Sequence, residues 1–155
     1  MNLFKLFPVA VAAFALAACD SSSSSSDDGS SSASTAKSSS SVSAAECALS
    51  SDGVKVVLPA GGETFKLGDS VTVVYGAKYS NASSFDILYY PNSSATGISV
   101  VSTSVGPDSP DGTECYTEKV LLSDTLSVSN SAFFRVRAYS KGTVRGDSKT
   151  FTVTK

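Results

Sequence analysis

Short apolar runs separated by turn residues occupy the chain from about residue 46 to Lys155. Each run is rich in β-branched or aromatic residues and is bounded by Gly, Pro, Asn, Asp or Ser, which is typical of strands joined by turns. No part of this region shows helical spacing of apolar residues over a window of about eleven residues. The runs that we predict as strands are 54–58, 71–75, 85–90, 98–105, 115–122, 132–139 and 148–154.

Several of these runs alternate between apolar and polar residues with a period of two. In 132–139, Phe134, Val136 and Ala138 share one face, and the two arginines between them share the other. One apolar and one wetter face per strand is characteristic of antiparallel sheets that pack face to face. About seven such strands predict an all-β, antiparallel sandwich of the immunoglobulin or fibronectin type III kind. Antibody landmarks are missing, since the chain has no tryptophan and its cysteine spacing does not fit the usual bridge.

The first residues have a different pattern. Lys5 is the only charge before an almost wholly apolar, alanine-rich stretch that ends at Ala18. A positive start and a short apolar run are typical of a secretory signal. A membrane-spanning helix needs about 20 consecutive apolar residues, and this run is shorter and carries Pro8 near its start. We therefore interpret residues 1–18 as a signal peptide rather than a retained anchor.

The apolar stretch ends in Leu16-Ala17-Ala18-Cys19. This motif resembles the lipobox of bacterial lipoproteins, which has the pattern Leu, small, small, Cys. The resemblance implies that the Cys19 thiol receives a diacylglyceryl group, that the signal is cut before Cys19, and that the new amine is acylated. Because each buried methylene contributes about 0.8 kcal/mol, several acyl chains would bind a lipid bilayer stably. The alternative is an ordinary signal peptide with a chance cysteine.

Asp20 directly follows the cysteine that the lipobox resemblance marks for lipidation. In enteric bacteria, an aspartate at this position tends to hold a lipoprotein in the inner membrane, but the rule does not extend to all bacterial groups. We expect a lipid-anchored protein of the cell envelope, with the outer membrane or cell surface favoured over the inner membrane.

Serine dominates residues 19–45, which we interpret as a disordered tether. The segment has no aromatic residue and only four charges. It cannot bury enough apolar area to offset a backbone ordering cost of about 1–2 kcal/mol per residue. A flexible segment of about 25 residues reaches roughly 25–30 Å. The tether would therefore lift a domain comprising residues 46–155 clear of lipid headgroups.

The three cysteines form two groups: Cys19 at the end of the apolar stretch, and Cys47 and Cys115 in the predicted domain. If Cys19 carries lipid, Cys47 and Cys115 remain as a pair in an exported, oxidising compartment. We predict a disulfide between them, which would contribute roughly 4 kcal/mol in the chain-entropy model. Two free buried thiols are the alternative. We expect no metal and no other cofactor, because the chain has no histidine and structural zinc prefers four ligands.

The stretches "VVLPAGGETFKLGDSVTVVYGA" and "RVRAYSKGTVRGDSKTFTVT" support a more specific comparison. They resemble the immunoglobulin-like domain of fungal Ser/Thr-rich, GPI-anchored cell-wall proteins and of scattered bacterial surface proteins. The family usually has tryptophan at the end of the second strand, where this chain has Tyr75. The resemblance implies a wall-associated or spacer module and brings no catalytic residues. The matched features are Pro59, the pair Gly61-Gly62, the turn at Gly68, and the closing D-S-x-x-F-T-V of 147–153.

Little in the sequence indicates catalysis or nucleic-acid binding. The formal net charge is −2 and no basic stripe is visible, so we expect no nucleic-acid partner. Without histidine, no Ser-His-Asp arrangement can form. Asp108, Asp111 and Glu114 in "PDSPDGTE" offer oxygen ligands for calcium, but their spacing is not that of an EF-hand and the prolines fit a plain turn. We predict that the protein is not an enzyme.

Tyrosines on the wetter strand faces are the best candidates for ligand binding. If the strands 85–90 and 132–139 are neighbours, one exposed sheet face would carry Tyr90, Tyr139, Arg135, Arg137 and Asp86. Aromatic rings beside hydrogen-bonding side chains could stack on sugar rings. Alternatively, Asp86 pairs with Arg135 or Arg137 across the strands and the tyrosines only cover the sheet.

The sequence leaves two main classes of function, with a small hydrolase a distant third. In the first, a surface lipoprotein presents the immunoglobulin-like domain as a spacer, an adhesion domain or a subunit of an envelope assembly, with an envelope protein as its partner. In the second, the domain is a carbohydrate-binding module for cell-wall or plant polysaccharide.

Overall fold

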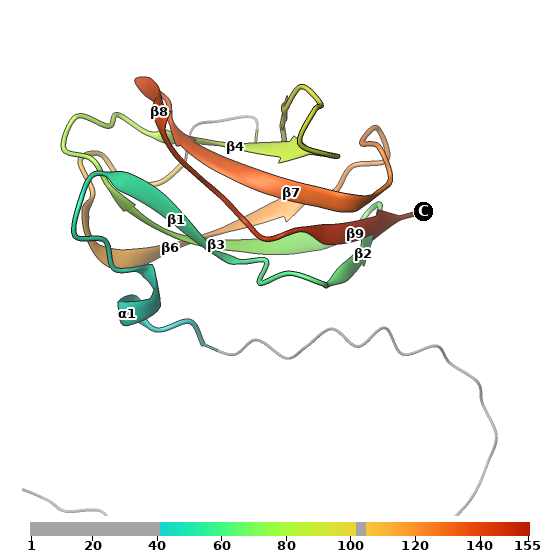
Figure 1. Ribbon diagram of the computed structural model, residues 1–155, viewed down its shortest axis with the longest axis horizontal. Helices are drawn as coiled ribbons and strands as arrows, with labels where there is room; N and C mark the ends of the chain where they lie inside the picture. The colour runs from blue at the N-terminus through green and yellow to red at the C-terminus, as the bar shows by residue number, and fades with distance from the viewer. Residues whose placement is uncertain (1–40, 102–104) are drawn as a thin grey trace, which may run out of the picture. The chain divides into compact units, whose positions relative to one another are not determined.

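The computed structural model describes residues 41–101 and 105–155 (Figure 1). The predicted signal peptide, Cys19 and most of the predicted tether lie outside these residues. None of the helices in the described part has the length and apolar character needed to cross a membrane. The elements are α1 (Ala44–Cys47), β1 (Gly53–Leu58), β2 (Thr64–Lys66), β3 (Ser70–Lys78), β4 (Phe85–Tyr90), β5 (Ile98–Ser99), β6 (Asp111–Leu121), β7 (Ser129–Ala138), β8 (Lys141–Asp147) and β9 (Phe151–Thr154).

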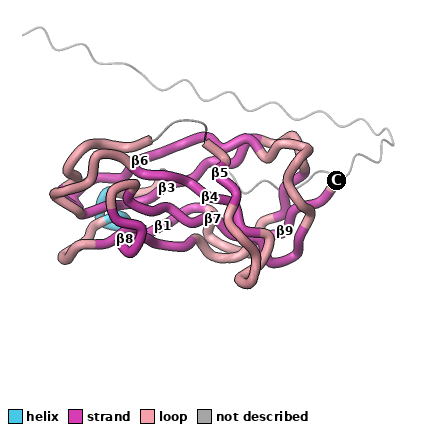
Figure 2. The backbone as a smooth tube through the Cα atoms, turned by 90° about the horizontal axis from the view of Figure 1, so that it is seen from above, coloured by secondary structure: helices cyan, strands magenta, loops and turns pink. Residues whose placement is uncertain are grey.

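The strands form two sheets, which confirms the predicted all-β sandwich. One sheet has the order β1-β3-β6, and the other has the order β2-β9-β7-β4-β5 with β8 also paired to β7. Strands β8 and β9 succeed each other along the same edge of β7, where Arg135 pairs with Asp147 and Ala132 with Phe151. Taken as one interrupted strand, they complete an immunoglobulin-type arrangement. Helix α1 lies at one end of the sandwich and the C-terminus at the other (Figures 1 and 2).

Alternation along the strands builds the core as predicted. Phe134, Val136 and Ala138 of β7 are fully buried. The odd-numbered residues of β4 are also fully buried and face the inner side of the other sheet. Complete burial of one large apolar side chain is worth about 1.5–3 kcal/mol, so these inner faces hold the two sheets together. The largest fully buried side chains are Tyr75, Tyr89, Phe85, Phe134, Phe151, Ile87 and Leu122.

The predicted strand over 98–105 is confirmed near its two ends, and residues 102–104 lie outside the described residues. Only Ile98–Ser99 pairs with β4 as a strand, and Val105 forms an isolated bridge with Phe85. The intervening Val100 and Val101 pack partly buried against the core. The apolar character of Val100 and Val101 therefore reflects side-chain packing at the edge of the sheet.

Two strands and one helix were not expected. Strand β2 has only three residues between turns, and it pairs with β9 in parallel, so the sandwich is not wholly antiparallel. Strand β8 contains two glycines and few apolar residues, and its pairing with β7 makes it a strand. In both cases, pairing with the neighbouring strand outweighs the weak intrinsic preference of the segment for strand structure.

Helix α1 corrects the C-terminal boundary of the predicted tether. It includes Ala44 and Ala45, which fall within the segment predicted to be disordered. The Glu46 carboxylate accepts a 2.7 Å hydrogen bond from the Ser43 amide, which caps the first turn. A disulfide joins Cys47 to Cys115 with their Cα atoms 5.3 Å apart, which confirms the predicted pair and ties α1 to β6.

Tyr75 of β3 is a buried polar residue inside the core. Its ring lies 5.6 Å from the Tyr116 ring and 6.0 Å from the Phe85 ring, measured between centroids. No described residue forms a hydrogen bond with its hydroxyl group. Burial raises the pKa of the Tyr75 phenol well above its ordinary value, and the negative charge of Glu118 adds to the effect.

We therefore expect Tyr75→Phe to lessen the loss of stability at alkaline pH. A phenol in the unfolded chain ionises near pH 10, whereas the raised pKa of Tyr75 keeps the folded chain protonated. The Tyr75 contribution is fully present below about pH 10 and is lost as pH rises further. Urea unfolding between about pH 9 and pH 11 should show a shallower decline in the free energy of unfolding for Tyr75→Phe than for the wild type. An equal decline in Tyr75→Phe and wild type would contradict this assignment.

Candidate ligand-binding surface

The outer face of β4, β7 and β8, which points away from the core, carries the predicted binding residues. Strand register places Asp86 opposite Arg137 and Tyr90 opposite Phe133. The amide of Tyr139 donates a 2.9 Å hydrogen bond to the carbonyl oxygen of Ser84, so the chain leading into β4 still borders β7 at that point. The five predicted residues therefore lie along one face, as the sequence suggested.

They do not form a single compact site. Tyr90 lies at one end of the β4–β7 ladder, while Tyr139 directly follows the other end. Six residue steps along β7 separate Phe133, the partner of Tyr90, from Tyr139. At about 3.3 Å per residue, the two tyrosines are roughly 20 Å apart along the sheet. No single sugar ring can contact both.

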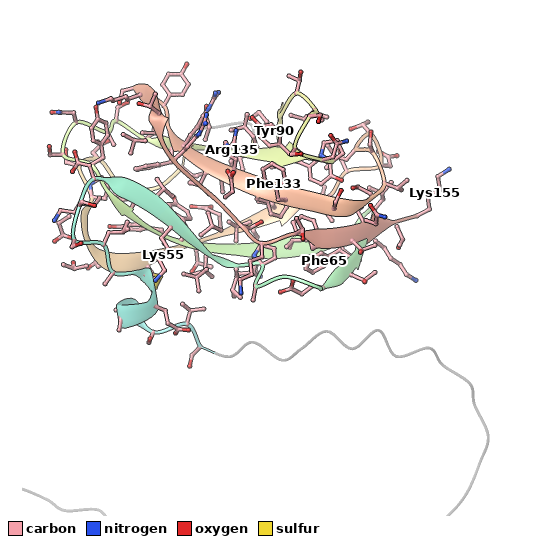
Figure 3. The ribbon with its side chains drawn as sticks, viewed as in Figure 1. Lys55, Phe65, Tyr90, Phe133, Arg135 and Lys155 are labelled. Atoms are coloured by element: carbon pink, nitrogen blue, oxygen red, sulfur yellow. A yellow bond between two sulfur atoms is a disulfide. The ribbon has the colours of Figure 1, made fainter. Side chains whose placement is uncertain are left out.

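Other groups already contact the Tyr90 ring. The Phe133 ring stacks on it with a centroid distance of 4.9 Å and an interplanar angle of 9°. The guanidinium carbon of Arg135 lies 4.8 Å from the Tyr90 centroid. A β-carbon added to Gly97 would collide with the same ring, so the backbone before β5 also contacts it. Figure 3 shows Tyr90, Phe133 and Arg135 gathered over β4 and β7. This cluster holds the sheet and its edge together rather than offering a free stacking surface.

The Arg135 guanidinium also forms an ion pair with Asp147. Its Nε and Nη2 atoms donate hydrogen bonds of 2.6 and 2.7 Å to the two carboxylate oxygens of Asp147. These bonds raise the pKa of the Arg135 guanidinium above its ordinary value, against a smaller opposing effect of burial. A bidentate pair of this kind fixes both side chains. The sequence missed Asp147 as a partner because β8 was not predicted.

Asp86 pairs with Arg137, one of the two alternatives that the sequence left open. The contact joins Nη2 of Arg137 to Oδ2 of Asp86 at 3.3 Å. It is a single contact, longer than those of Arg135, and the Arg137 side chain is 41% exposed. This pair therefore leaves much of the Arg137 guanidinium open to solvent.

Arg145 is a residue of this face that sequence reasoning did not find. It lies on β8 directly opposite Arg137 of β7. Its side chain is exposed, and the neighbouring Val144 is buried on the inner side. The alternation of "TVRGD" around Val144 is the only signal that could have placed it, and the two flanking glycines obscured that signal.

Tyr139 keeps an open ring. It is 67% exposed, the largest exposed fraction among the exposed large hydrophobic side chains of the described residues. The adjacent Ala138 is buried in the core. Tyr139 lies in the turn between β7 and β8, but its amide bond to Ser84 extends the β4–β7 ladder by one residue. Alternation along that extended ladder places Tyr139 on the side of Arg137.

The acidic residues that the sequence offered as calcium ligands are not assembled into a site among the described residues. The Asp111 carboxylate accepts hydrogen bonds of 2.7 and 2.9 Å from the hydroxyl and amide groups of Thr113. These bonds lower the pKa of Asp111. The Asp111 carboxylate is therefore used within a local turn. Within residues 41–101 and 105–155, no group of three or more His, Cys, Asp or Glu side chains could hold a metal ion.

A shallow hollow lies beside α1. It has a volume of about 550 Å³ and is lined by small residues of α1, by the chain just after the helix, and by Gly112 and Thr113. None of its lining residues carries an ionisable side chain. The hollow therefore offers no acid, base or charged anchor for a substrate.

Comparison with known proteins gives no relative for this chain: no family model matches it, and a search of curated proteins finds no match.

Proposed function

We propose that this chain is a membrane-anchored surface lipoprotein that presents its sandwich as a non-catalytic module. The module would serve as a spacer, an adhesion domain or a subunit of an envelope assembly. The lipobox-like end of the apolar leader, Leu16-Ala17-Ala18-Cys19, supplies the anchor in this proposal.

The observation that carries the proposal is which two cysteines form the disulfide and which one does not. Cys47 and Cys115 are joined to each other, so Cys19 is the one cysteine outside that bond. A structural disulfide is typical of proteins exported to an oxidising compartment. Lipidation at that position needs export and a free thiol at the end of the leader, and both agree with this partition.

The charged side chains on the outer face favour a binding or spacing role over a catalytic role. Two of the three arginines on the outer face are paired with carboxylates, in the pairs Arg135–Asp147 and Arg137–Asp86. Such pairs hold neighbouring strands in register, which suits a rigid module. The chain enters the sandwich at α1 and leaves it at the opposite end, after β9 (Figure 1). A module with this layout holds the two ends of its chain at opposite ends of the sandwich.

Metabolic labelling tests the anchor. Cells that express the full chain with radiolabelled palmitate should yield a labelled protein in the membrane fraction, and Cys19→Ser should abolish the label. The double variant Cys47→Ser/Cys115→Ser is the matched control and should keep it, because it removes two cysteines without touching the leader. Label that persists in Cys19→Ser would refute lipidation at this residue.

A further inference from the structure

Two arginines face each other on the outer face near the β7–β8 hairpin. Arg137 and Arg145 are direct cross-strand partners. The β-carbons of such partners lie roughly 4.5–5.5 Å apart, and like charges in these positions destabilise a sheet. A negative charge placed between these two arginines would therefore be favourable.

The protein supplies only part of that compensation. Asp86 contacts Arg137 through one oxygen at 3.3 Å, and Asp147 directs both of its oxygens to Arg135. Among the described residues, no carboxylate lies within 4.0 Å of the Arg145 guanidinium. A guanidinium group has five N–H donors in a planar fork that matches a carboxylate. The Arg137–Arg145 pair thus has donors to spare toward solvent.

An open aromatic ring lies beside this pair. Tyr139 is two residues beyond Arg137 along the chain, on the same side of the sheet, and its ring is 67% exposed. Tyr90 differs, because Phe133, Arg135 and the backbone at Gly97 already contact its ring. A ring that is exposed in the turn directly after β7 is suited to stack against a flat, partly apolar ligand.

From this arrangement we propose that Arg137, Arg145 and Tyr139 form a binding site for an acidic polysaccharide built from uronic acids. A uronate unit combines a carboxylate, which the two guanidinium groups bind, with a sugar ring, which Tyr139 stacks on. The proposed site depends on the proposed function in one respect: it supplies a ligand for the non-catalytic surface module.

The pattern of groups favours uronate over other occupants. A neutral glycan would leave the facing arginines uncompensated, and a phosphatidylglycerol headgroup would pair with the arginines but has no sugar ring on which Tyr139 could stack. Any repeating polymer with one carboxylate per unit also lets several weak contacts act together, which raises the overall affinity.

Affinity electrophoresis of the detergent-solubilised full chain tests the site. Polygalacturonate in the gel should retard the wild-type chain, and fully methyl-esterified polygalacturonate, which keeps the sugar backbone but lacks the charge, should not. Arg145→Gln should weaken binding about threefold or more, as expected for loss of an exposed ion pair. Tyr139→Ala should weaken it similarly, and added salt should weaken it for the wild type.

Lys119→Gln is the matched control, because Lys119 is on β6 of the other sheet and the charge change is the same. It should bind polygalacturonate like the wild type. Binding that is equal in wild type, Arg145→Gln and Tyr139→Ala would overturn the site. Dextran sulfate and phosphatidylglycerol vesicles test for attraction by charge alone. If either retains the chain as strongly as polygalacturonate does, and Tyr139→Ala does not change that retention, the proposed site would also be overturned. Because the measurement uses purified chain, it stays informative even if Cys19 carries no lipid.

Discussion

Removing the Cys47–Cys115 bond should lower the free energy of unfolding by about 4 kcal/mol. The bond closes a loop with a sequence separation of 68 residues, and the chain-entropy model gives this magnitude for a loop of that length. The double variant Cys47→Ser/Cys115→Ser isolates the effect, because it leaves no free thiol in the domain. Urea unfolding at neutral pH, monitored by circular dichroism, measures the change.

Cys19→Ser is the control for this measurement. It removes a cysteine outside the sandwich, so the unfolding midpoint of the domain should stay at the wild-type value. A loss below about 1 kcal/mol in the double variant would contradict the expectation and would mean that the unfolded chain gains little freedom when the loop opens.

Gly76→Ala should destabilise the sandwich by about 3 kcal/mol or more, because the added methyl group overpacks a closely fitted contact. Gly76 of β3 pairs with Cys115 of β6, and the backbone of Cys47 lies directly against it. A β-carbon at this position would overlap the carbonyl oxygen of Cys47 and would lie 2.7 Å from its carbonyl carbon. The disulfide prevents α1 from moving away, so a small shift cannot relieve the overlap.

Two comparisons make the Gly76 prediction specific. Gly142→Ala should be close to neutral, because a β-carbon at Gly142 meets no atom within 4 Å. In the Cys47→Ser/Cys115→Ser background, Gly76→Ala should cost clearly less than in the wild type, because α1 is then free to shift. Thermal or urea unfolding of the wild type, each variant and their combination gives this coupling as a double-mutant cycle. Strictly additive effects would show that the disulfide does not hold α1 against β3.

The covered Tyr90 ring and the overlooked Arg145 show where sequence reasoning about the candidate site stopped. Period-two alternation correctly placed Tyr90, Arg135 and Arg137 on one face, because alternation is a local property of a strand. It could not show that Phe133 and the backbone at Gly97 contact Tyr90, since those contacts depend on the neighbouring strand and on the chain that leads into β5.

The ion pairs on the same face show a second limit of prediction from the sequence. Asp86 and Arg137 are 51 residues apart in the chain, and their pairing was foreseen as one of two alternatives. Arg135 and Asp147 are only 12 residues apart, yet their pairing was missed. Nearness in the chain did not help, because β8 has two glycines and little apolar character, and only its hydrogen bonds to β7 make it a strand.

By itself, the sequence determined the class of fold, the inward faces of β4 and β7, and the pairing of Cys47 with Cys115. These depend on periodicity along single strands, on the number of cysteines and on the lipobox-like position of Cys19, which need no knowledge of neighbours. The tertiary structure decided which strands pair and in what register, and so which charges meet across the sheet. Arg145 faces Arg137 and Tyr139 stays exposed for that reason: cross-strand partners are set by the packing of the whole domain, which no short stretch of sequence contains.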